Sequence, residues 1–457
     1  MANKTVLTNT AKLYTVENMY YSPVAITPPY NTVPDSMYLV LSHQDPWDVD
    51  SNPPTPSQDA KTLKLLRKKI FAVKKITEND ISPVIQRINW ESGAVYDYYD
   101  DNIDITATDN NGFTVYNYYV KNKYDQVFKC LWNNNGNQST LEPYFEPGTF
   151  QTNNIFQGID GYKWKYIYTI ETALKVKFMN NDWMPIPVGY NIPNSLLTSA
   201  GSGNIDVINI IDGGDGYDPV NTTISVVVTG DGTGCEATPV IVNGSITDVT
   251  LTNTGINYTY ADVSFTTTGT FVGNSATAIS PTSPIGGHGY DPISELGCTH
   301  VMLAPEVDGS ENNTIPTDIT YHQVSVLINP ISKQSVSTNE PNASGSLYKT
   351  STDIIVSAGR GTFNNNDTVY QTDNQGNVTF SATVLSFNSD TNTISVINIS
   401  GSLTTDVITN GSTSRSVLSS TTPDFDVFSG YFMYIENRSG IQRSADGIEQ
   451  FKIVLGY

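Results

Sequence analysis

The chain has 457 residues, and its 24 Lys and Arg against 45 Asp and Glu give a formal net charge of −21 at pH 7. A chain of this length predicts about three domains. Nucleic-acid binding needs cationic groups against phosphate, so a chain this acidic is a poor candidate for it. The cysteines, at Cys130, Cys235 and Cys298, are too few and too far apart for a full disulfide framework or for a zinc site built on CxxC pairs. We interpret them as buried free thiols.

The amino-terminal segment, MANKTVLTNTAKLYTVENMYY, has no continuous apolar run of the length of a signal peptide. No apolar stretch reaches the roughly 18 residues that a membrane helix needs. Asn-x-Ser/Thr triplets, such as those at Asn257 and Asn398, are therefore interpreted as unglycosylated. These features predict a protein that is made in a reducing cytoplasm, stays soluble and does not insert into membranes.

The segment 57–76, SQDAKTLKLLRKKIFAVKKI, is the one that predicts a helical region, near residues 57–70. Ser57 can cap the helix, and Asp59 falls in its first turn. Apolar side chains follow at helical spacing, at Leu63, Leu66 and Ile70. The last part of the segment, IFAVKKI, fits a strand equally well.

The same segment carries seven of the chain's 24 positive charges. Two interpretations stay open, namely a solvated helix face and a docking patch for an acidic partner. The candidate residues of the patch are Lys64, Arg67, Lys68 and Lys69. A nucleic-acid role is disfavoured, because aromatic residues do not alternate with the cations to stack on bases.

Five further segments predict β-strands, because β-branched and aromatic residues run between Asn, Asp, Gly and Pro. They are 35–41, 112–120, 162–170, 321–328 and 449–457. Segment 162–170, YKWKYIYTI, alternates strictly between two faces. One face carries Tyr162, Trp164, Tyr166, Tyr168 and Ile170, and the other carries Lys163, Lys165 and Thr169. This pattern predicts a half-buried antiparallel strand whose aromatic face packs against a core or a partner.

Two segments predict inserted all-β modules. The first, about 200–285, we name the repeat module, because GNIDVINIIDGGDGY recurs in it as GSITDVTLTNTGINY at a spacing of 41 residues. The matched pairs include Gly203 with Gly244 and Tyr217 with Tyr258. In the second, about 346–422, short Thr- and Ser-rich strands alternate with Asn, Gly and Asp turns. That pattern predicts a small barrel or a short sandwich.

No set of residues points to a catalytic site, so we expect a protein that is not an enzyme and that holds no cofactor. His288, Cys298 and His300 are close in sequence, but zinc prefers four ligands with tighter Cys spacing, and a Gly-rich loop with ordinary side chains is the preferred interpretation. The acidic run 97–109 is dense in oxygen ligands for calcium but lacks the EF-hand pattern and its glycine. An exposed acidic loop is preferred there, and no bound metal is expected.

Five segments, in order along the chain, carry a resemblance to a known family. Segment 36–50 has an apolar strand before an acidic-Pro-Trp turn, and segment 82–101 has an aliphatic pair, an Arg and a Trp. Segment 160–170 reads Asp-Gly-Tyr-x-Trp-x-Tyr, segment 322–331 is a strand ending in Asn-Pro, and segment 429–457 has a Tyr-x-Glu-Asn-Arg motif before the closing strand. The interface or structural candidates in these motifs are Asp45, Pro46, Trp47, Arg87, Trp90, Tyr162, Trp164, Tyr166, Asn329, Pro330, Tyr434, Glu436, Asn437 and Arg438.

Together the five segments resemble the gene-product-eight family of baseplate wedge proteins of T-even-type contractile-tailed bacteriophages. The resemblance covers about 1–195, 286–345 and 423–457. The chain departs from the family's pattern at Gln86, where the family has Pro, and the two modules have no counterpart in it.

The resemblance implies a mainly β fold, with a β-sandwich core, a small helical region and the two inserted all-β modules. The expected parts are 1–199 for the amino-terminal core, 200–285 for the repeat module, 286–345 for the core continuation, 346–422 for the second module and 423–457 for the closing core strands. Within the last part, Glu436 beside Arg438 is expected to lock the turn before the final strand by a charge-assisted hydrogen bond.

The resemblance also implies a structural virion protein of the tail baseplate, made in the host cytoplasm. As a homodimer among other wedge proteins, it would link inner wedge proteins to peripheral baseplate and tail-fibre network proteins. It would also take part in baseplate assembly and switching. The alternative is a glycan-binding adhesin or receptor-binding tail protein, because Gly- and Tyr-rich β modules offer rings that stack on sugars. A polysaccharide depolymerase is disfavoured, since it predicts the many short rungs of a parallel β-helix.

Overall fold

The computed structural model describes residues 15, 16, 19, 36–105, 107–109, 113–146, 154–187, 203–218, 220, 223–269, 271–333, 343 and 345–456. Over this part the chain is mainly β, with antiparallel sheets, a closed barrel and three α-helices, so the predicted fold class is confirmed. No helix in the described residues is long and apolar enough to cross a membrane.

The chain divides into two compact units, each assembled from segments that are far apart in sequence. Unit 1 comprises Met1–Met19, Ser82–Met302 and Val454–Tyr457, and unit 2 comprises Tyr20–Ile81 and Leu303–Ile453. The repeat module falls within unit 1, and the second predicted module falls within unit 2. The segments that the resemblance assigns to a single core are therefore shared between the two units.

Unit 2 is built around a five-stranded sheet in the order β19-β2-β1-β17-β27. In that order the strands are Leu347–Tyr348, Ile70–Ile76, Met37–Ser42, Thr320–Ile328 and Tyr431–Gln442. Strand β1 pairs antiparallel with β2 and with β17, and every residue of its MYLVLS sequence is buried. Helix α2, Ala60–Lys68, packs Leu66 into the core that also contains Tyr38 and Phe425.

The residue that caps α2 is Asp59, not Ser57 as predicted. Asp59 Oδ1 accepts hydrogen bonds from the backbone N of Lys61 and Thr62 at 3.0 and 2.9 Å. The hydroxyl of Ser57 donates to the Asp59 carboxylate instead. The helix ends at Lys68, so Ile70, which fits the helical spacing, is the first residue of β2.

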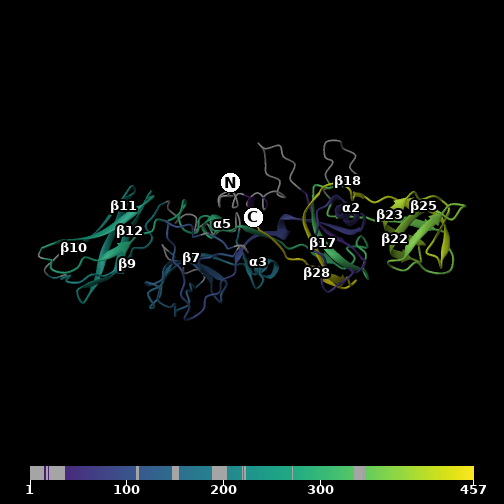
Figure 1. The fold of residues 1–457 in the computed structure, drawn as a ribbon. Coiled ribbons are helices and arrows are strands. Elements are labelled where there is room, and N and C mark those ends of the chain that lie inside the picture. Colours follow the sequence, from purple (N-terminus) through teal and green to yellow (C-terminus); the bar gives the residue numbers. More distant parts are fainter. Residues whose placement is uncertain are drawn as a thin grey trace. The chain divides into compact units, whose positions relative to one another are not determined.

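A closed six-stranded barrel, ordered β20-β23-β22-β21-β24-β25, forms the second predicted module (green to yellow in Figure 1). Its strands in chain order are β20 Thr352–Val356, β21 Thr368–Thr372, β22 Val378–Asn388, β23 Thr393–Gly401, β24 Val407–Thr409 and β25 Ser414–Thr421. Aliphatic and aromatic residues from all six strands fill the interior, including Val384 and Ile394. Closure removes the open sheet edges that such short strands would otherwise expose.

Two pairs of short strands complete unit 2. Strand β16, Glu306–Asp308, pairs with β28, Ile448–Gln450, and β18, Ile331–Ser332, pairs with β26, Phe425–Asp426. The closing segment 449–457, which was predicted as one strand, contains parts of two strands. These strands, β28 and β29, Ile453–Gly456, belong to different sheets.

Unit 1 contains two four-stranded sheets. The first, β4-β5-β7-β6, consists of Tyr119–Lys121, Gln126–Trp132, Lys163–Thr169 and Ile155–Gln157, and the second, β29-β15-β3-β8, consists of Ile453–Gly456, His300–Leu303, Ile81–Gln86 and Trp183–Pro185. Two tyrosine hydroxyls from the first sheet donate to backbone carbonyls of the second: Tyr119 to Gln86 at 3.1 Å and Tyr168 to Pro185 at 3.2 Å. Short helices α3, Thr172–Phe178, and α5, Pro292–Glu295, lie in the connections.

Two predictions about the first sheet of unit 1 are wrong. The predicted strand 112–120 is a strand only from Tyr119 onward, because most of its described residues form bends and loop. The strict alternation of β7 is broken by a bulge, since Tyr166 pairs with Phe128 while Tyr168 pairs with the adjacent Val127. Tyr168 therefore lies on the lysine side of the strand and not on the aromatic side.

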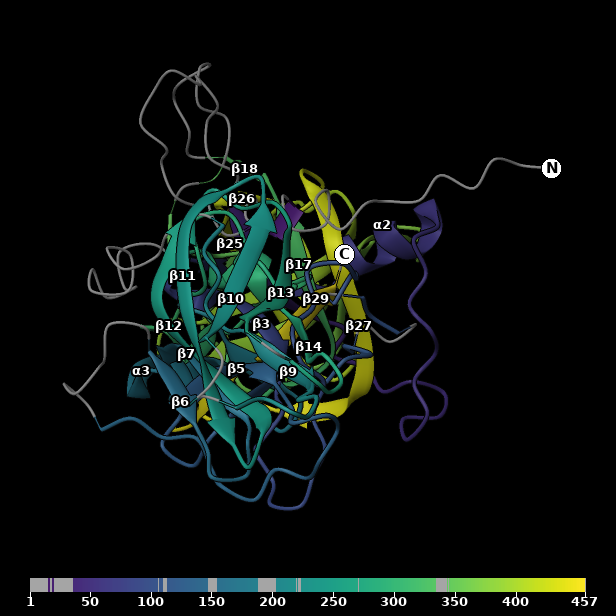
Figure 2. The same cartoon turned by 90° about the vertical axis from the view of Figure 1, so that its left-hand side faces the viewer.

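The repeat module consists of paired ribbons, which are drawn in teal in Figures 1 and 2. Strand β10, Thr223–Gly230, pairs with β13, Ala261–Thr268; β11, Thr233–Val242, pairs with β12, Ser245–Ile256; and β14, Thr277–Ile279, pairs with β9, Asn209–Asp212. Their inner faces form one core around Ile205, Ile246 and the two matched tyrosines.

The two copies of the repeat exchange equivalent hydrogen bonds. The backbone N of Tyr258 donates to Gly203 O, and the backbone N of Tyr217 donates to Gly244 O, both at 3.0 Å. The β11–β12 and β14–β9 ladders also carry a bulge at matched positions, Glu236/Ala237 and Thr277/Ala278. Each copy thus accepts a hydrogen bond from the other and pairs its strands with it, which gives the module a pseudo-two-fold arrangement. This arrangement explains why two repeats suffice for one core.

Candidate interaction sites

A corner around Trp47 brings together the first and the last of the five family-like segments. The indole N–H of Trp47 donates to Arg438 O of β27 at 3.0 Å, and the His43 ring stacks on the indole with centroids 3.9 Å apart. Asp50 and Asn437 add a second fastening: Gly440 N donates to Asp50 Oδ2 at 3.1 Å, and Asn437 Nδ2 donates to Pro54 O at 2.9 Å. We name this cluster the Trp47 corner.

Two side-chain pairs connect the Trp47 corner to other parts of unit 2. Lys69 Nζ lies 2.8 Å from Asp45 Oδ2, and His322 Nε2 lies 3.2 Å from Asp50 Oδ1. Burial, together with the nearby Lys69 ammonium, lowers the pKa of His43. A hollow of about 440 Å³ opens beside the corner and includes Asp45, Pro46 and Trp47 in its lining. The corner is therefore held by specific contacts and borders a hollow.

The expected lock between Glu436 and Arg438 is not formed. Both residues lie within strand β27, and Arg438 Nε is 4.0 Å from Glu436 Oε1, which is too long for a hydrogen bond. The Glu436 carboxylate instead accepts the hydroxyl of Tyr434 at 2.9 Å, and together with burial it raises the pKa of Tyr434. Position i and i+2 of a strand share a face, which explains this contact.

Asn329 and Pro330 end strand β17 in a turn. Asn329 has a φ of +48°, a left-handed conformation that Asn tolerates better than most residues. Its side-chain Oδ1 accepts the backbone N of Ser36 at 2.9 Å, and its own N donates to Ser36 O at 2.8 Å. This Asn-Pro motif therefore fastens the residue before β1 to the end of β17.

Tyr162, Trp164 and Tyr166 are inside unit 1. They form an aromatic cluster with Tyr96 and Phe128, and Trp164 is completely buried. The Tyr162 and Trp164 rings stack with centroids 5.4 Å apart. The aromatic face of β7 therefore packs against its own core and is not available to a partner.

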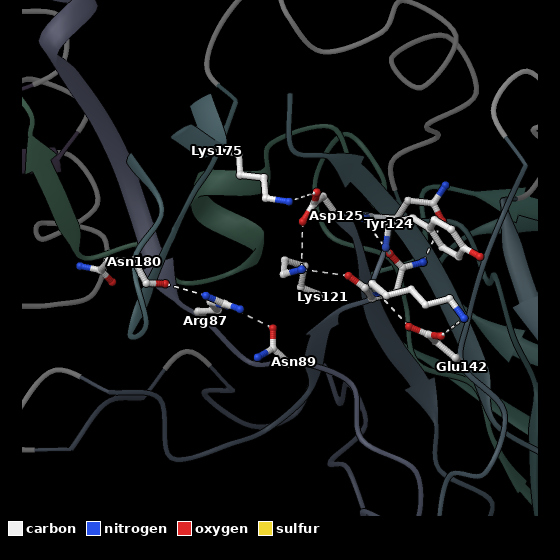
Figure 3. A network of polar contacts seen from close by, with 11 residues as sticks. Arg87, Asn89, Lys121, Tyr124, Asp125, Glu142, Lys175 and Asn180 are labelled. Atoms are coloured by element: carbon white, nitrogen blue, oxygen red, sulfur yellow. Dashed lines mark hydrogen bonds and ion pairs between the residues drawn. The ribbon is translucent and has the colours of Figure 1, made fainter. Parts of the chain in front are cut away.

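Arg87 and Trp90 also make internal contacts. Arg87 Nη1 donates to Asn180 O at 2.9 Å and Nε donates to Asn89 Oδ1 at 3.1 Å (Figure 3). Trp90 Nε1 donates to Ser139 Oγ at 3.0 Å. The matched residues of segment 82–101 thus hold loops of unit 1 together.

The four candidates of the docking patch differ in what they contact. The Arg67 guanidinium donates to three backbone carbonyls, those of Val427, Ser429 and Gly430, and lies 4.8 Å from the centroid of the Phe432 ring. Lys68 Nζ donates to a backbone carbonyl at 3.2 Å, Lys69 pairs with Asp45, and Lys64 is exposed. Arg67 therefore fixes the loop before β27, and the partner of the patch stays a prediction.

A buried face of lysines in unit 1 went unrecognised in the sequence. Lys129 and Lys165 lie directly opposite each other on β5 and β7, and Lys163 lies on the same face of β7. All three are at least nine-tenths buried. Like charges opposite each other destabilise a sheet, so each lysine needs an acidic partner. We name this set the lysine face, and the alternating Lys residues of YKWKYIYTI were the available signal.

Lys129 is paired within a fully enclosed cluster. Its Nζ lies 2.9 Å from Glu295 Oε1 and 3.6 Å from the centroid of the Tyr99 ring, and His288 Nδ1 lies 2.6 Å from the same carboxylate oxygen. Burial lowers the pKa of Lys129 and of His288. Burial alone would raise the pKa of Glu295, but Lys129 and His288 outweigh it and hold that pKa far below its usual value.

The other two lysines attach the repeat module to the sheet. Lys163 Nζ lies 3.0 Å from Asp248 Oδ1, and Lys165 Nζ lies 3.1 Å from Asp206 Oδ2. Asn209 Nδ2 of the module also donates to Leu131 O of β5 at 2.9 Å. The module is therefore bound to unit 1 through partly buried ion pairs, and its other faces carry the exposed Thr and Ser side chains of β10 and β13.

The residues named as metal candidates make other contacts. His288 is bound to Glu295, Cys298 Sγ lies near two backbone carbonyls, and His300 Nδ1 contacts the Thr299 hydroxyl. In the acidic run, Asp101 accepts hydrogen bonds from Thr282. Across the described ranges, no group of three or more His, Cys, Asp or Glu is arranged to hold a metal ion. Cys130 and Cys298 are buried free thiols, and Cys235 is a half-buried one.

No family model matches this chain, and no curated protein matches it either. A functional proposal therefore depends on the five family-like segments and on the surfaces described above. Of those segments, 36–50, 322–331 and 429–457 contribute to one sheet of unit 2, whereas 82–101 and 160–170 contribute to unit 1.

Proposed function

We propose that the chain is a structural subunit of the baseplate wedge of a contractile phage tail and is not an enzyme. One observation supports it most: three family-like segments that are far apart in sequence become neighbours in space. Strands β1, β17 and β27 are adjacent in one sheet, and the Trp47 indole is hydrogen-bonded to Arg438 O. Chance likenesses scattered along a chain have no reason to converge on one sheet and one corner.

The proposed role is mechanical. The subunit joins inner wedge proteins to peripheral baseplate and fibre-network proteins, and it takes part in assembly and in the rearrangement that starts contraction. Packed interfaces with two discrete arrangements, and not an active site, carry such a switch. Exposed aromatic side chains suit large permanent interfaces, and Phe428 and Tyr431 of unit 2 are each 54% exposed.

A homodimer is part of the proposal. Strand β27 has 12 residues, lies at the edge of the five-stranded sheet and, among the described strands, pairs with β17 alone. Trp47 and Asp50 bind two of its backbone groups, Arg438 O and Gly440 N. A long edge strand is a template for pairing with another chain. Light scattering of the purified chain at micromolar concentration is expected to show the mass of a dimer, and a strict monomer would contradict this part of the proposal.

The test of the function is location in the virion. Mass spectrometry of purified particles is expected to detect the chain, and antibodies against the repeat module are expected to label the baseplate in negative-stain electron micrographs. Label along the fibres would favour the adhesin alternative. Absence of the chain from purified particles would refute both.

One observation favours the alternative, a glycan-binding tail protein. A hollow of about 260 Å³ in unit 1 is lined by Tyr98, Tyr99 and Tyr260 together with Asp100, Asn102 and Asp262. Rings and carboxylates together suit a sugar, because a ring stacks on its apolar face and carboxylates accept its hydroxyls. Binding of the full chain to a glycan array, lost in Tyr260→Ala, would support this function, and a flat array would remove it.

A further inference from the structure

A groove in unit 2 lies between helix α2, strand β23 of the barrel and the segment 422–428. Its volume is about 280 Å³. The apolar part of its lining includes Ile70, Val396 and Phe425, which are buried, and Phe428, which is largely exposed. An apolar floor with an exposed aromatic side chain at the same site is typical of a surface that receives a side chain of another molecule. We name it the cationic groove, after the three cationic side chains that also line it.

Three cations line the same groove, namely Arg67, Lys68 and Lys333, against a single carboxylate in the described lining, Asp426. Arg67 and Lys68 donate to backbone carbonyls, which are neutral, and the Asp426 carboxylate acts electrostatically on Arg67. None of the three forms an ion pair with a described residue. The three cations therefore produce a local positive potential in a chain whose net charge is −21.

One buried polar group in the lining lacks a partner. The hydroxyl oxygen of Thr350 is buried, and it makes no hydrogen bond to any described residue. Leaving a buried hydroxyl unpaired costs about 1–3 kcal/mol, so such groups are normally satisfied. A ligand group would remove this cost only by reaching the oxygen itself, which is shielded from solvent.

We propose that the cationic groove docks an acidic peptide segment of a partner protein, with an apolar side chain seated on the floor and carboxylates against the cations. Charge complementarity selects this occupant, because the groove is cationic in an otherwise acidic chain. A second copy of the chain is the other occupant that the test below distinguishes. The inference deepens the proposed structural function, on which it rests for the partner being a protein.

The probes are an array of short peptides. Each has one Phe, Tyr or Leu with Asp and Glu on both sides, and the distance between the apolar residue and the acids is varied across the array. Matched peptides carry Asn and Gln in place of the acids, or Ser in place of the apolar residue. The full chain is applied to the array, and the best peptide is then measured in solution by fluorescence anisotropy. Binding is expected only for peptides that have both features.

The variants Lys68→Glu and Lys333→Glu are expected to weaken the best peptide roughly tenfold or more each, and Thr350→Val is expected to weaken it less. A peptide with Lys in place of the acids is expected to bind the double charge-reversal variant. Lys64→Glu is the matched control, because Lys64 is exposed on the same helix and outside the groove lining. Circular dichroism checks that every variant is folded.

Four results would overturn the inference: no acidic-apolar peptide binds, binding is indifferent to Lys68→Glu and Lys333→Glu, Lys64→Glu weakens it equally, or those variants dissociate a dimer. The third result would mean general attraction to the helix, and the fourth would mean that a second copy occupies the groove. Because the assay uses no phage particle, its failure leaves the wedge proposal to be judged by the virion experiments alone.

Discussion

The substitution Lys129→Met tests whether the lysine face is held by charge pairing or only by packing. Methionine retains most of the apolar stem but removes the ammonium that lies 2.9 Å from Glu295 Oε1. The carboxylate then stays buried, at 7% exposure for the whole residue, with only His288 and the Gly289 N–H against it. Removing one partner of a buried pair costs about 3–5 kcal/mol, because the remaining charge is uncompensated.

The assay is urea unfolding of the full chain, followed by tryptophan fluorescence, since four of the five tryptophans lie in unit 1. The midpoint of the transition reported by this signal is compared between variants at equal slope. Lys123→Met is the control, because the Lys123 side chain is 64% exposed and solvent screens its pair with Glu142 at 3.1 Å. Lys129→Met is expected to lower the midpoint much more than the control does.

The pH dependence separates the two explanations. Folding lowers the pKa of His288 and of Glu295, so the unfolded chain binds more protons and wild-type stability falls as the pH falls, first below about pH 6.5 and then below about pH 4.3. In Lys129→Met, protonation of His288 or Glu295 relieves the unpaired carboxylate. The deficit relative to wild type should therefore be largest near pH 7.5 and shrink toward pH 5. A deficit that does not depend on pH, or one no larger than the control's, would refute the reasoning.

Three further substitutions test other contacts by urea unfolding, followed by tryptophan fluorescence for unit 1 and by circular dichroism for unit 2, whose one tryptophan is Trp47. Gly255→Ala should be more destabilising than Gly376→Ala by about 1 kcal/mol or more, because both have positive φ but only a Cβ at Gly255 would meet backbone, 2.8 Å away. Trp47→Phe removes the hydrogen bond to Arg438 O and should lower the free energy of unfolding of unit 2 by about 0.5–1.5 kcal/mol, the usual net value of one hydrogen bond. An unchanged midpoint would mean that this bond is not stabilising. Arg67→Lys should destabilise the same unit, since an ammonium cannot reproduce the planar fork that donates to three carbonyls, and equal midpoints would contradict this.

Local patterns were sufficient for the elements whose cause is local. The apolar run of β1 and the Asn- and Gly-punctuated strands of the barrel occur where the pattern predicts them, and β2 follows the strand alternative of the two that its sequence left open. The 41-residue repeat also indicated a single module, because Gly203 and Gly244 occupy equivalent hydrogen-bonded positions. In each case the information lies within a few residues of the element, or in a second copy of its pattern.

The errors occur where a distant segment decides the outcome. Strict alternation in β7 fails at Tyr168, because the bulge is set by the pairing with β5. Lys129 pairs with Glu295, which lies 166 positions away, and neither local sequence contains a pattern that predicts this pairing. The expected hydrogen bond between Glu436 and Arg438 is missing for the same reason, since the backbone there continues as a strand paired with β17 and does not turn.

The location of the family-like residues bears on where partners are to be sought. Trp164 is fully buried, Arg87 and Trp90 hold loops of unit 1, and Trp47 is fastened to β27, so these matched side chains serve the fold. Internal residues of this kind constrain the architecture, and they leave the exposed surface free to vary. Partner contacts are therefore expected at exposed, unmatched positions such as Phe428, and this is why the sharpest experiments on assembly target the cationic groove and not the motifs.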